Sequence, residues 1–576
     1  MKKRLTACAL AVTAAFSVFA ASCGGNKGGT DTIRFYLWSA DGGEPAGFSE
    51  VLKTFNDGAG KELGVELAFS FDTQSDYKQK LNLAMASGQD QYDVVFDAAW
   101  IYLSEFAKKD YYYNLEEYFK SETYSGLKNA FDSDYLERNK FNGGVYGIPL
   151  TETFSDISVA YIRKDWREEC AVDTDFVKPS GIATSTVTAA MLADGIDDFD
   201  ELEYYLYWVK ANKDGVVPAL SNNDATWGAW DLANTHELVA KSAKDYVDAG
   251  IKTNILVTTG VEAKAYIRRG QVEAVSLDNY LDPSSEEGLN AFPDGFNSID
   301  AKWQEDYAIT RKWKEDGIIS ASVMSTTDAD AKFEAGMGGT VVQSISNFST
   351  VESRLKAQFP NAELEIFVND PAIREKRENY AQTDYKAWNY LCVPKTVSKS
   401  KLDGIMKFMN WLFESQENHD LFQYGIKGKH WDVAKDVNGI EIEGTVDTVG
   451  FESYTFPAYE LTWNPNYIRV QSASDPKVME YMRYMYDMDR YVEILYSEFR
   501  FDSHRTDALA NAVSNGDLAT AITTANSYQL GQIANPISSW NAELSKRYSN
   551  ASLQTAMKTI QAEIKAQLQN YIDGLE

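Results

Sequence analysis

The sequence predicts an α/β protein with two domains. Its 576 residues are too many for one ordinary hydrophobic core, so two domains of roughly 200–300 residues each are expected. Near the N-terminus, segments in which apolar residues alternate as in strands take turns with segments that have helical spacing. Hydrophobic residues make up 44% and charged residues 24% of the chain, which is normal for a folded soluble protein and argues against global disorder.

The clearest pattern lies within the first hundred residues. Apolar residues alternate as in strands at 33–37 and 65–71, and a short buried strand is expected at 93–96. Between these strands, 48–55 and 77–85 carry apolar residues at helical spacing. This order predicts right-handed βαβ units around a largely parallel sheet, whose ligands bind beyond the carboxyl ends of the strands.

A second α/β region is expected after Glu152. The acid-rich stretch 194–201 lacks the ligand spacing of a calcium-binding loop, so Asp198 is interpreted as the N-cap of a helix. Whether the protein holds a structural calcium ion elsewhere is left open. Apolar stripes predict helices at 198–211, 301–316, within 398–424, and at 551–572.

The N-terminus has the order of a secretory signal peptide. Basic residues at 2–4 precede an uncharged run at 5–21, which is too short and too poor in large residues for a comfortable transmembrane helix. Cys23, at the expected cleavage point, resembles the acylated cysteine of the bacterial lipoprotein lipobox, although Ala20 stands where Leu is usual.

Residues 1–22 are therefore predicted to be a signal peptide and 23–30 a lipidated N-terminus with a flexible linker. The protein would be held at the extracytoplasmic face of the cell membrane by its lipid alone. The alternative is ordinary cleavage that leaves Cys23 as an incidental free thiol.

Charge and cysteine content restrict the partners. A formal net charge of −30 repels phosphate backbones and anionic lipid surfaces, so nucleic acid is not expected as a partner. Beyond the signal and the lipobox, Cys170 and Cys392 remain. They are too few for a disulfide framework, and two separate buried thiols are favoured over a pair.

Motifs for catalysis and metal binding were not found. The chain has four histidines without metal-ligand spacing, no CxxC, no GxSxG elbow, and no phosphate-binding glycine loop. Paired carboxylates could support glycoside hydrolysis, but 85 acidic residues produce close pairs by chance. The prediction is therefore a protein that is not an enzyme, has no cofactor and has no metal at its ligand site, with a structural calcium ion alone left open.

Tryptophans beside short polar residues are the most informative loop pattern. Trp38 precedes Asp41, and Trp100 follows Asp97, each pair at the predicted end of a strand. Indoles can cover the apolar face of a sugar ring, while carboxylates and amides accept its hydroxyls. The alternative is that such a tryptophan only covers the edge of a core.

Several segments resemble one family. The Trp38 loop and the segments LAMASG at 83–88, YDVVF at 92–96 and GVYGIP at 144–149 follow the order seen in extracellular solute-binding proteins of ABC importers. The segment QYGIKGKHW at 423–431 is similar to a larger lipoprotein subgroup whose members tend to serve oligosaccharide importers.

This resemblance implies a periplasmic-binding-protein-like fold, with two α/β lobes, an interlobe hinge and a ligand cleft between the lobes. Lobe one would comprise 31–156 and 386–434, and lobe two 157–385 and 435–576. Ile157–Ile162 would be the first interlobe crossing.

The function implied is capture of a carbohydrate, with an oligosaccharide favoured, and delivery to the permease subunits of an ABC transporter by a monomeric protein. The alternatives are a tethered glycan-processing enzyme and a rigid glycan-binding module. The sugar's identity, length and charge are left open. The candidate ligand-binding residues are Trp38, Asp41, Glu44, Asp97, Trp100, Glu152, Trp227, Trp230, Asp278, Asn279, Asn347, Trp388, Tyr459 and Trp463.

Overall fold

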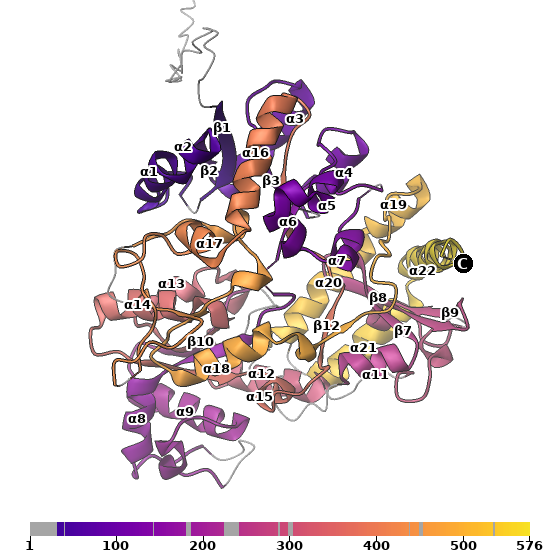
Figure 1. Cartoon of the computed structure of the whole chain (residues 1–576). Helices are drawn as coiled ribbons and strands as arrows, with labels where there is room; N and C mark the ends of the chain where they lie inside the picture. Colours follow the sequence, from indigo (N-terminus) through magenta and orange to yellow (C-terminus); the bar gives the residue numbers. More distant parts are fainter. Residues whose placement is uncertain are drawn as a thin grey trace, which may run out of the picture.

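Figure 1 shows an upper lobe, a lower lobe, and a third unit at their side. We refer to the upper lobe as lobe one and the lower as lobe two. This computed structural model describes residues 31–39, 41–98, 100–141, 143–151, 153–179, 186–223, 241–285, 288–297, 303–436, 438–448, 453–533 and 536–575.

Lobe one is built on a five-stranded sheet in the order β2-β1-β3-β13-β4. Strand β1 lies between β2 and β3 and is parallel to both, as the βαβ pattern predicted, whereas β13 is antiparallel to both β3 and β4. The carboxyl ends of β1, β3 and β4 therefore meet the amino end of β13 at one edge. The strands are β1 (Asp31–Trp38), β2 (Val65–Asp72), β3 (Val94–Ala98), β4 (Ile148–Leu150) and β13 (Asn389–Cys392).

Helices cover both faces of this sheet. The side chain of Thr73 caps the start of α3, and Gly88 ends that helix in the left-handed conformation. Phe408 of α16 packs edge-on against Phe35 of β1. The helices are α1 (Phe48–Asp57), α2 (Ala59–Leu63), α3 (Gln74–Ser87), α4 (Leu103–Lys108), α5 (Glu116–Lys120), α6 (Ser125–Ala130), α7 (Ser133–Arg138), α16 (Lys399–Leu412) and α17 (Gln416–Gln423), with 3-10 turns η1 (Glu122–Tyr124), η7 (Ala458–Glu460) and η8 (Pro465–Tyr467).

Lobe two has a mixed four-stranded sheet in the order β11-β5-β10-β6. The side chain of Asp198 accepts a hydrogen bond from Glu201 N and caps α9, as predicted. The strands are β5 (Ser158–Arg163), β6 (Val217–Leu220), β10 (Gly338–Ser344) and β11 (Leu364–Val368). The helices are α8 (Lys164–Val172), α9 (Phe199–Asn212), α13 (Ala329–Glu334), α14 (Phe348–Gln358), α15 (Pro371–Arg374) and α18 (Pro476–Tyr486), with 3-10 turns η2 (Ala189–Ala193), η5 (Val323–Ser325), η6 (Ile345–Asn347) and η9 (Met488–Arg490).

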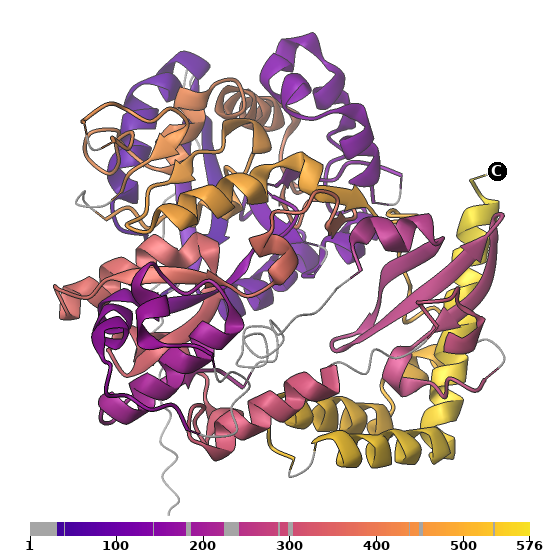
Figure 2. The ribbon, with the colours of Figure 1, turned by 90° about the horizontal axis from the view of Figure 1, so that it is seen from below.

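The third unit has a core of its own, formed by 255–281 and 499–572. Its antiparallel strands lie alongside α22, away from the lobes (Figure 2). The predicted stripe of α22 is buried against this sheet. The elements are β7 (Ile251–Thr258), β8 (Val261–Arg268), β9 (Gln271–Ser276), α11 (Ala243–Asp248), α12 (Trp303–Glu315), α19 (Asp507–Val513), α20 (Gly516–Gln529), α21 (Pro536–Ser549), α22 (Ala551–Asp573), η3 (Asp278–Tyr280) and η4 (Leu289–Ala291).

The chain passes between the cores of the two lobes at 150–157, 380–387 and 461–470. The sequence interpretation placed the first crossing at Ile157–Ile162, but most of that stretch lies in β5, where it pairs with β10 and β11. Near the crossings are the short strands β12 (Ala381–Thr383), β14 (Thr445–Val446), β15 (Val470–Gln471) and β16 (Tyr491–Glu493).

Three further observations concern the lobe assignment, the cysteines and the length of the helices. Phe456 and Leu461 pack in the lobe-one core, although the sequence analysis assigned them to lobe two; the lobe boundaries themselves stay a prediction. Cys170 and Cys392 are separate buried thiols, as expected. Within the described residues, no helix combines the length and apolar character needed to cross a membrane.

Candidate functional site

An aromatic row lies where β1 and β3 end and β13 begins. We use this name for Trp100, Trp38, Tyr459, Trp463 and Trp388, in that spatial order. The ring centroids of successive members are 5.8, 6.2, 5.8 and 6.1 Å apart. The ends of the row face solvent, since Trp100 is 50% and Trp388 40% exposed, whereas Trp38 is only 5% exposed.

Sheet topology brings these side chains together. Trp38 is the last residue of β1, and Trp100 follows β3 by two positions. Trp388 immediately precedes β13, whose first residue Asn389 pairs with Ala98 at the end of β3. An antiparallel neighbour thus places a residue from the start of one strand beside residues from the ends of two others.

Trp38 is held from two sides by the turn at 458–463. Its indole Nε1 donates to Tyr459 Oη at 2.6 Å, and its backbone N donates to Glu460 Oε2 at 3.0 Å. The indole also packs edge-on against Phe96 and Tyr77. Trp38 therefore links the exposed ends of the row and offers little surface of its own.

Asp97 is fully buried beneath this edge of the sheet. Its oxygens accept hydrogen bonds from Ala98 N, Tyr102 N and the Tyr112 hydroxyl, at 2.8, 3.0 and 2.8 Å. Burial raises the pKa of Asp97 to about 7, although these hydrogen bonds oppose the change. The Asp97 carboxyl thereby fixes the turn that carries Trp100. Because Asp97 is fully buried, it has no exposed oxygen for the direct ligand contact that the sequence predicted.

Asp41 and Glu44 are exposed on the loop after β1. Asp41 Oδ1 accepts a hydrogen bond from Gly43 N at 2.9 Å, which shapes this loop. Gly42 adopts a φ of 78°, and a Cβ there would lie 2.9 Å from Thr73 N. The loop is thus seated tightly on the start of α3, close to the end of β1. Contact of Asp41 and Glu44 with a ligand stays a prediction.

Three other candidates lie on elements that carry no member of the row. Asp278 and Asn279 lie in the third unit, where Asp278 forms an ion pair with Lys264 at 3.1 Å. Asn347 is exposed at the start of α14 in lobe two and donates to Gln343. The remaining three, Glu152, Trp227 and Trp230, lie outside the described residues.

A cavity lies between the lobes, where the family resemblance implied a ligand cleft, but the residues that line it were not foreseen from the sequence. We call it the interlobe cavity; its volume is about 280 Å³. An adjoining hollow of about 570 Å³ shares Asp132, Tyr385, Met488 and Tyr491 with it. The interlobe cavity is lined by Ala130, Phe131, Asp132, Tyr135, Thr151, Thr153, Phe154, Tyr385, Asn466, Ile468, Met485, Tyr486, Met488 and Tyr491.

The cavity wall combines aromatic rings with hydroxyl groups. The Tyr135 and Thr151 hydroxyls are 2.5 Å apart, and those of Thr153 and Tyr491 are 2.7 Å apart. Sequence reasoning missed this set because its members come from three crossings and both lobes. The 34 tyrosines of the chain were a compositional signal, but no local pattern identified which of them line a cavity.

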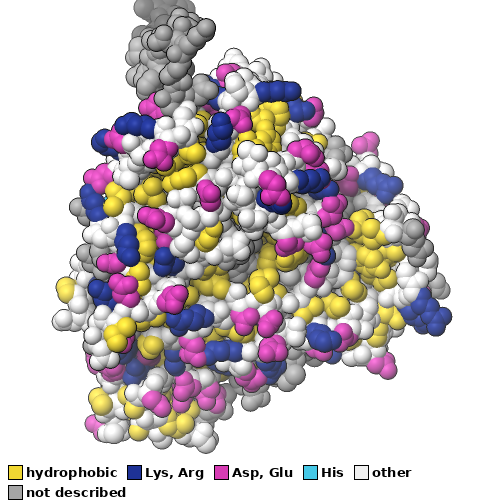
Figure 3. Space-filling model, viewed as in Figure 1, with side chains coloured by type: hydrophobic (Ala, Val, Ile, Leu, Met, Phe, Trp, Pro, Cys, Tyr) yellow, Lys and Arg dark blue, Asp and Glu magenta, His cyan; other side chains and the backbone are white. Residues whose placement is uncertain are grey.

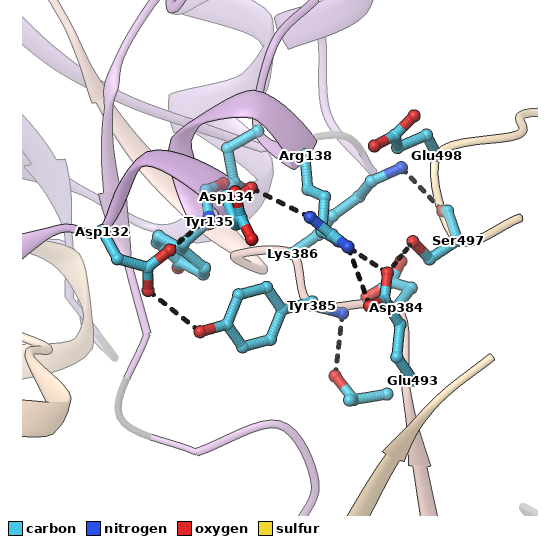
Figure 4. Close-up of polar contacts among 12 residues, drawn as sticks. Asp132, Asp134, Tyr135, Arg138, Asp384, Tyr385, Lys386, Glu493, Ser497 and Glu498 are labelled. Atoms are coloured by element: carbon cyan, nitrogen blue, oxygen red, sulfur yellow. Dashed lines mark hydrogen bonds and ion pairs between the residues drawn. The ribbon is translucent and has the colours of Figure 1, made fainter. Parts of the chain in front are cut away.

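Figure 4 shows the polar contacts beside the cavity. The Tyr385 hydroxyl donates to Asp132 Oδ2 at 3.0 Å. Arg138 of α7 donates twice to Glu493 of β16, at 2.5 and 2.8 Å. Lys386 is buried and donates to the Ser497 carbonyl at 2.8 Å; burial lowers the pKa of this amine to about 7.

Within the described part of the chain, no group of three or more His, Cys, Asp or Glu side chains is arranged to hold a metal ion. The side chains gathered at the row and the cavity are instead aromatic rings, hydroxyls and amides. Such a set can stack on apolar ring faces and exchange hydrogen bonds with hydroxyls.

Comparison with known proteins gives two short sequence matches. The chain is 26% identical over 177 residues to a carbohydrate ABC transporter substrate-binding protein of Streptococcus pneumoniae serotype 4, covering 31% of each chain. It is 29% identical over 147 residues to lipoprotein LipO of Bacillus subtilis, covering 26% of this chain and 28% of LipO. The matches thus span less than a third of these relatives. No family model matches the sequence.

Structural similarity extends over nearly the whole chain. The N-glycan transport solute-binding protein NgtS of S. pneumoniae superposes with a TM-score of 0.61 at 16% identity, covering 95% of this chain and all of NgtS. An HMO-binding, ABC-transporter-associated solute-binding protein of Bifidobacterium longum infantis gives 0.52 at 13% identity, with coverage of 95% and 99%. The chain therefore has the two-lobed α/β fold of solute-binding proteins, as the sequence resemblance implied.

Proposed function

We propose that this protein captures a carbohydrate outside the cell and delivers it to the permease subunits of an ABC importer. The observation that carries the proposal is the aromatic row at the carboxyl ends of the parallel strands β1 and β3, where such sheets bind ligands, in a fold that solute-binding proteins share. An oligosaccharide is the favoured ligand because the exposed rings are spread along the row, where several sugar units could be contacted.

Closure of the lobes would complete the site. The interlobe cavity has walls from both lobes and from the crossings, so its shape depends on the angle between the lobes. A ligand that contacts both lobes in the closed form would shift the population toward that form. The permease would then recognise the closed protein.

Binding without chemistry is part of the proposal. Asp97 and Glu460, the two carboxyls beneath the row, are fully buried and offer no exposed oxygen to a sugar in this structure. The competing function is a tethered glycan-processing enzyme. Incubation of the pure protein with each bound saccharide tests this point: release of product above background, lost on replacement of one carboxylate, would establish the competing function.

The partners follow from charge and the N-terminus. The face in Figure 3 has Lys and Arg side chains interspersed with Asp and Glu, and the net charge of −30 disfavours nucleic acid. We propose membrane attachment through acylated Cys23 alone, at the outer face of the cell membrane. The protein would act as a monomer.

A thermal-shift screen tests the central proposal. The soluble body is melted with mono- and oligosaccharides in turn, because a ligand that binds only the native state must raise the melting temperature. Saturable stabilisation by at least one saccharide, with quenching of tryptophan fluorescence, is expected. If a broad panel of saccharides leaves the melting temperature unchanged, carbohydrate capture is refuted.

A further inference from the structure

The buried carboxyl of Glu460 lies directly under the centre of the aromatic row. Glu460 belongs to η7, on the same turn as Tyr459 and just before Trp463, and none of its surface is exposed. Its Oε2 accepts the backbone N–H of Trp38, while the neighbouring Tyr459 holds the Trp38 indole. One turn therefore carries two members of the row and binds a third through two hydrogen bonds.

The surroundings of Glu460 favour its uncharged form. Among the described residues, no Lys, Arg or His forms an ion pair with it. The titratable groups that interact with it are Tyr459 on its own turn and Tyr77 of α3, and Tyr77 in turn interacts with Asp97 of β3 and the Cys392 thiol of β13. All of these are neutral or acidic. Burial raises the pKa of Glu460 well above its ordinary value.

Ionisation would place an uncompensated negative charge in this apolar layer. A buried carboxylate without a cation is costly, and the structure relieves that cost by admitting water or by moving the charged group outward. Outward movement of Glu460 would carry Tyr459 and Trp463 with it, because they share the turn. The hydrogen bonds to Trp38 would then break, and the row would be divided at its middle.

We propose that Glu460 is the positioning residue of the aromatic row: its uncharged, buried carboxyl keeps the row continuous through the hydrogen bond to Trp38 N, and its ionisation separates the 458–463 turn from Trp38. The relevance of this device to ligand capture rests on the proposed function. The device itself is a property of the free protein and can be measured without a saccharide.

Near-ultraviolet circular dichroism of the whole soluble chain gives the test. Coupled indoles produce a strong signal, and the difference between wild type and Trp38→Phe isolates the contribution of Trp38 beside Trp100. We expect this difference signal to be constant at acidic pH and to lose about half of its amplitude or more at alkaline pH. Far-ultraviolet spectra at each pH verify that the fold persists.

Three variants at two glutamates supply the rescue, the control and the loss of the hydrogen bond. Glu460→Gln keeps the acceptor for Trp38 N but cannot ionise, so its Trp38 signal should stay constant across the pH range. Glu203→Gln is the matched control, because Glu203 is also buried and accepts an indole N–H, that of Trp313 in α12, at 3.0 Å. The Trp38 signal of Glu203→Gln should respond to pH as that of the wild type does. Glu460→Ala should show the reduced signal at every pH at which it folds.

Two results would overturn the proposal: a wild-type signal that is flat until the chain unfolds, or a Glu460→Gln signal that falls with pH as in the wild type. Neither result bears on carbohydrate capture, which the saccharide screen tests separately. Conversely, a failed screen would leave the pH response of the row intact.

Discussion

Arg138 and Glu493 are 355 positions apart in the chain and are joined by two parallel hydrogen bonds from guanidinium to carboxylate. The Arg138 guanidinium also lies 5.6 Å from the ring of Tyr385, a residue of the second crossing. This contact fastens a helix of lobe one to a strand beside the crossing, at the mouth of the hollow that adjoins the interlobe cavity.

The first prediction concerns this ion pair. Because both side chains are partly exposed, Glu493→Gln should cost only about 0–1 kcal/mol of stability. The same free energy can change the ratio of open to closed forms several-fold. We expect a larger radius of gyration by small-angle scattering at a nearly normal melting temperature. Asp248→Asn, which breaks an exposed ion pair within α11, is the matched control and should leave the scattering unchanged.

The second prediction separates the tryptophans of the row. Trp38→Ala removes a buried indole and should lower the free energy of unfolding by about 3–5 kcal/mol. Trp100→Ala removes a half-exposed indole and should leave melting nearly normal, while weakening saccharide binding by about one to two decades. Melting curves and titration calorimetry on the same samples decide the point. A Trp100→Ala protein that melts much earlier but binds normally would assign Trp100 to the core.

The third prediction concerns Asp97 and pH. Its folded pKa of about 7 lies above the ordinary 3.8, so the folded state retains a proton that the unfolded state has released. Its stabilising contribution is complete below about pH 4 and is lost as pH rises through 7. Relative to Asp97→Asn, the wild-type free energy of unfolding should fall by up to about 4 kcal/mol between pH 4 and 8. Urea unfolding of both proteins at a series of pH values measures this difference. If the free energies of unfolding of wild type and Asp97→Asn change in parallel with pH, the prediction is wrong.

The fourth prediction has the opposite sign. Burial lowers the pKa of Lys386 from 10.5 to about 7, so the unfolded state binds the additional proton between these values. Stability conferred by Lys386 therefore rises with pH across that window, and Lys386→Met should flatten the rise. Burial also lowers the pKa of Lys252, to about 8, so the stability of Lys386→Met should still rise with pH, but less steeply. Equal slopes in wild type and Lys386→Met would contradict the assignment.

The fifth prediction concerns the anchor. The mature protein should begin at Cys23, carry acyl chains and partition with membranes. Cys23→Ala should abolish acylation and release the protein into the soluble fraction. Mass spectrometry of the N-terminal peptide is decisive, since an unmodified N-terminus at another residue would exclude a lipid anchor at Cys23.

Local pattern was sufficient for most of lobe one. Strand alternation and helical spacing depend only on residues close together in the chain. Each element predicted in this way is present, including the strands at 33–37 and 65–71 and the helix at 77–85. The stripe at 551–572 also predicted α22 correctly. Strand β13 was not foreseen, because its four residues join the sheet from a place almost 300 positions later, and no local signal fixes such a register.

The candidate site was predictable only in outline. The position of Trp38 at the end of β1 followed from periodicity, but its burial follows from Tyr459, which lies 421 positions away. Asp97 was expected to face a ligand, yet an aspartate after a buried strand can equally accept backbone N–H groups of the following turn. Composition identified the residue types, and tertiary packing decided which of them face solvent.

The packing of α22 on β9 has a consequence for biogenesis. Gln561 donates to the Val275 carbonyl across 286 positions of chain. At about 5–20 residues per second, roughly 15–60 s of synthesis separate these two partners. During that interval the apolar face of the β7–β9 sheet lacks the cover that α22 provides. A chain that ends before α22 would leave this face exposed, and we expect such a fragment to aggregate.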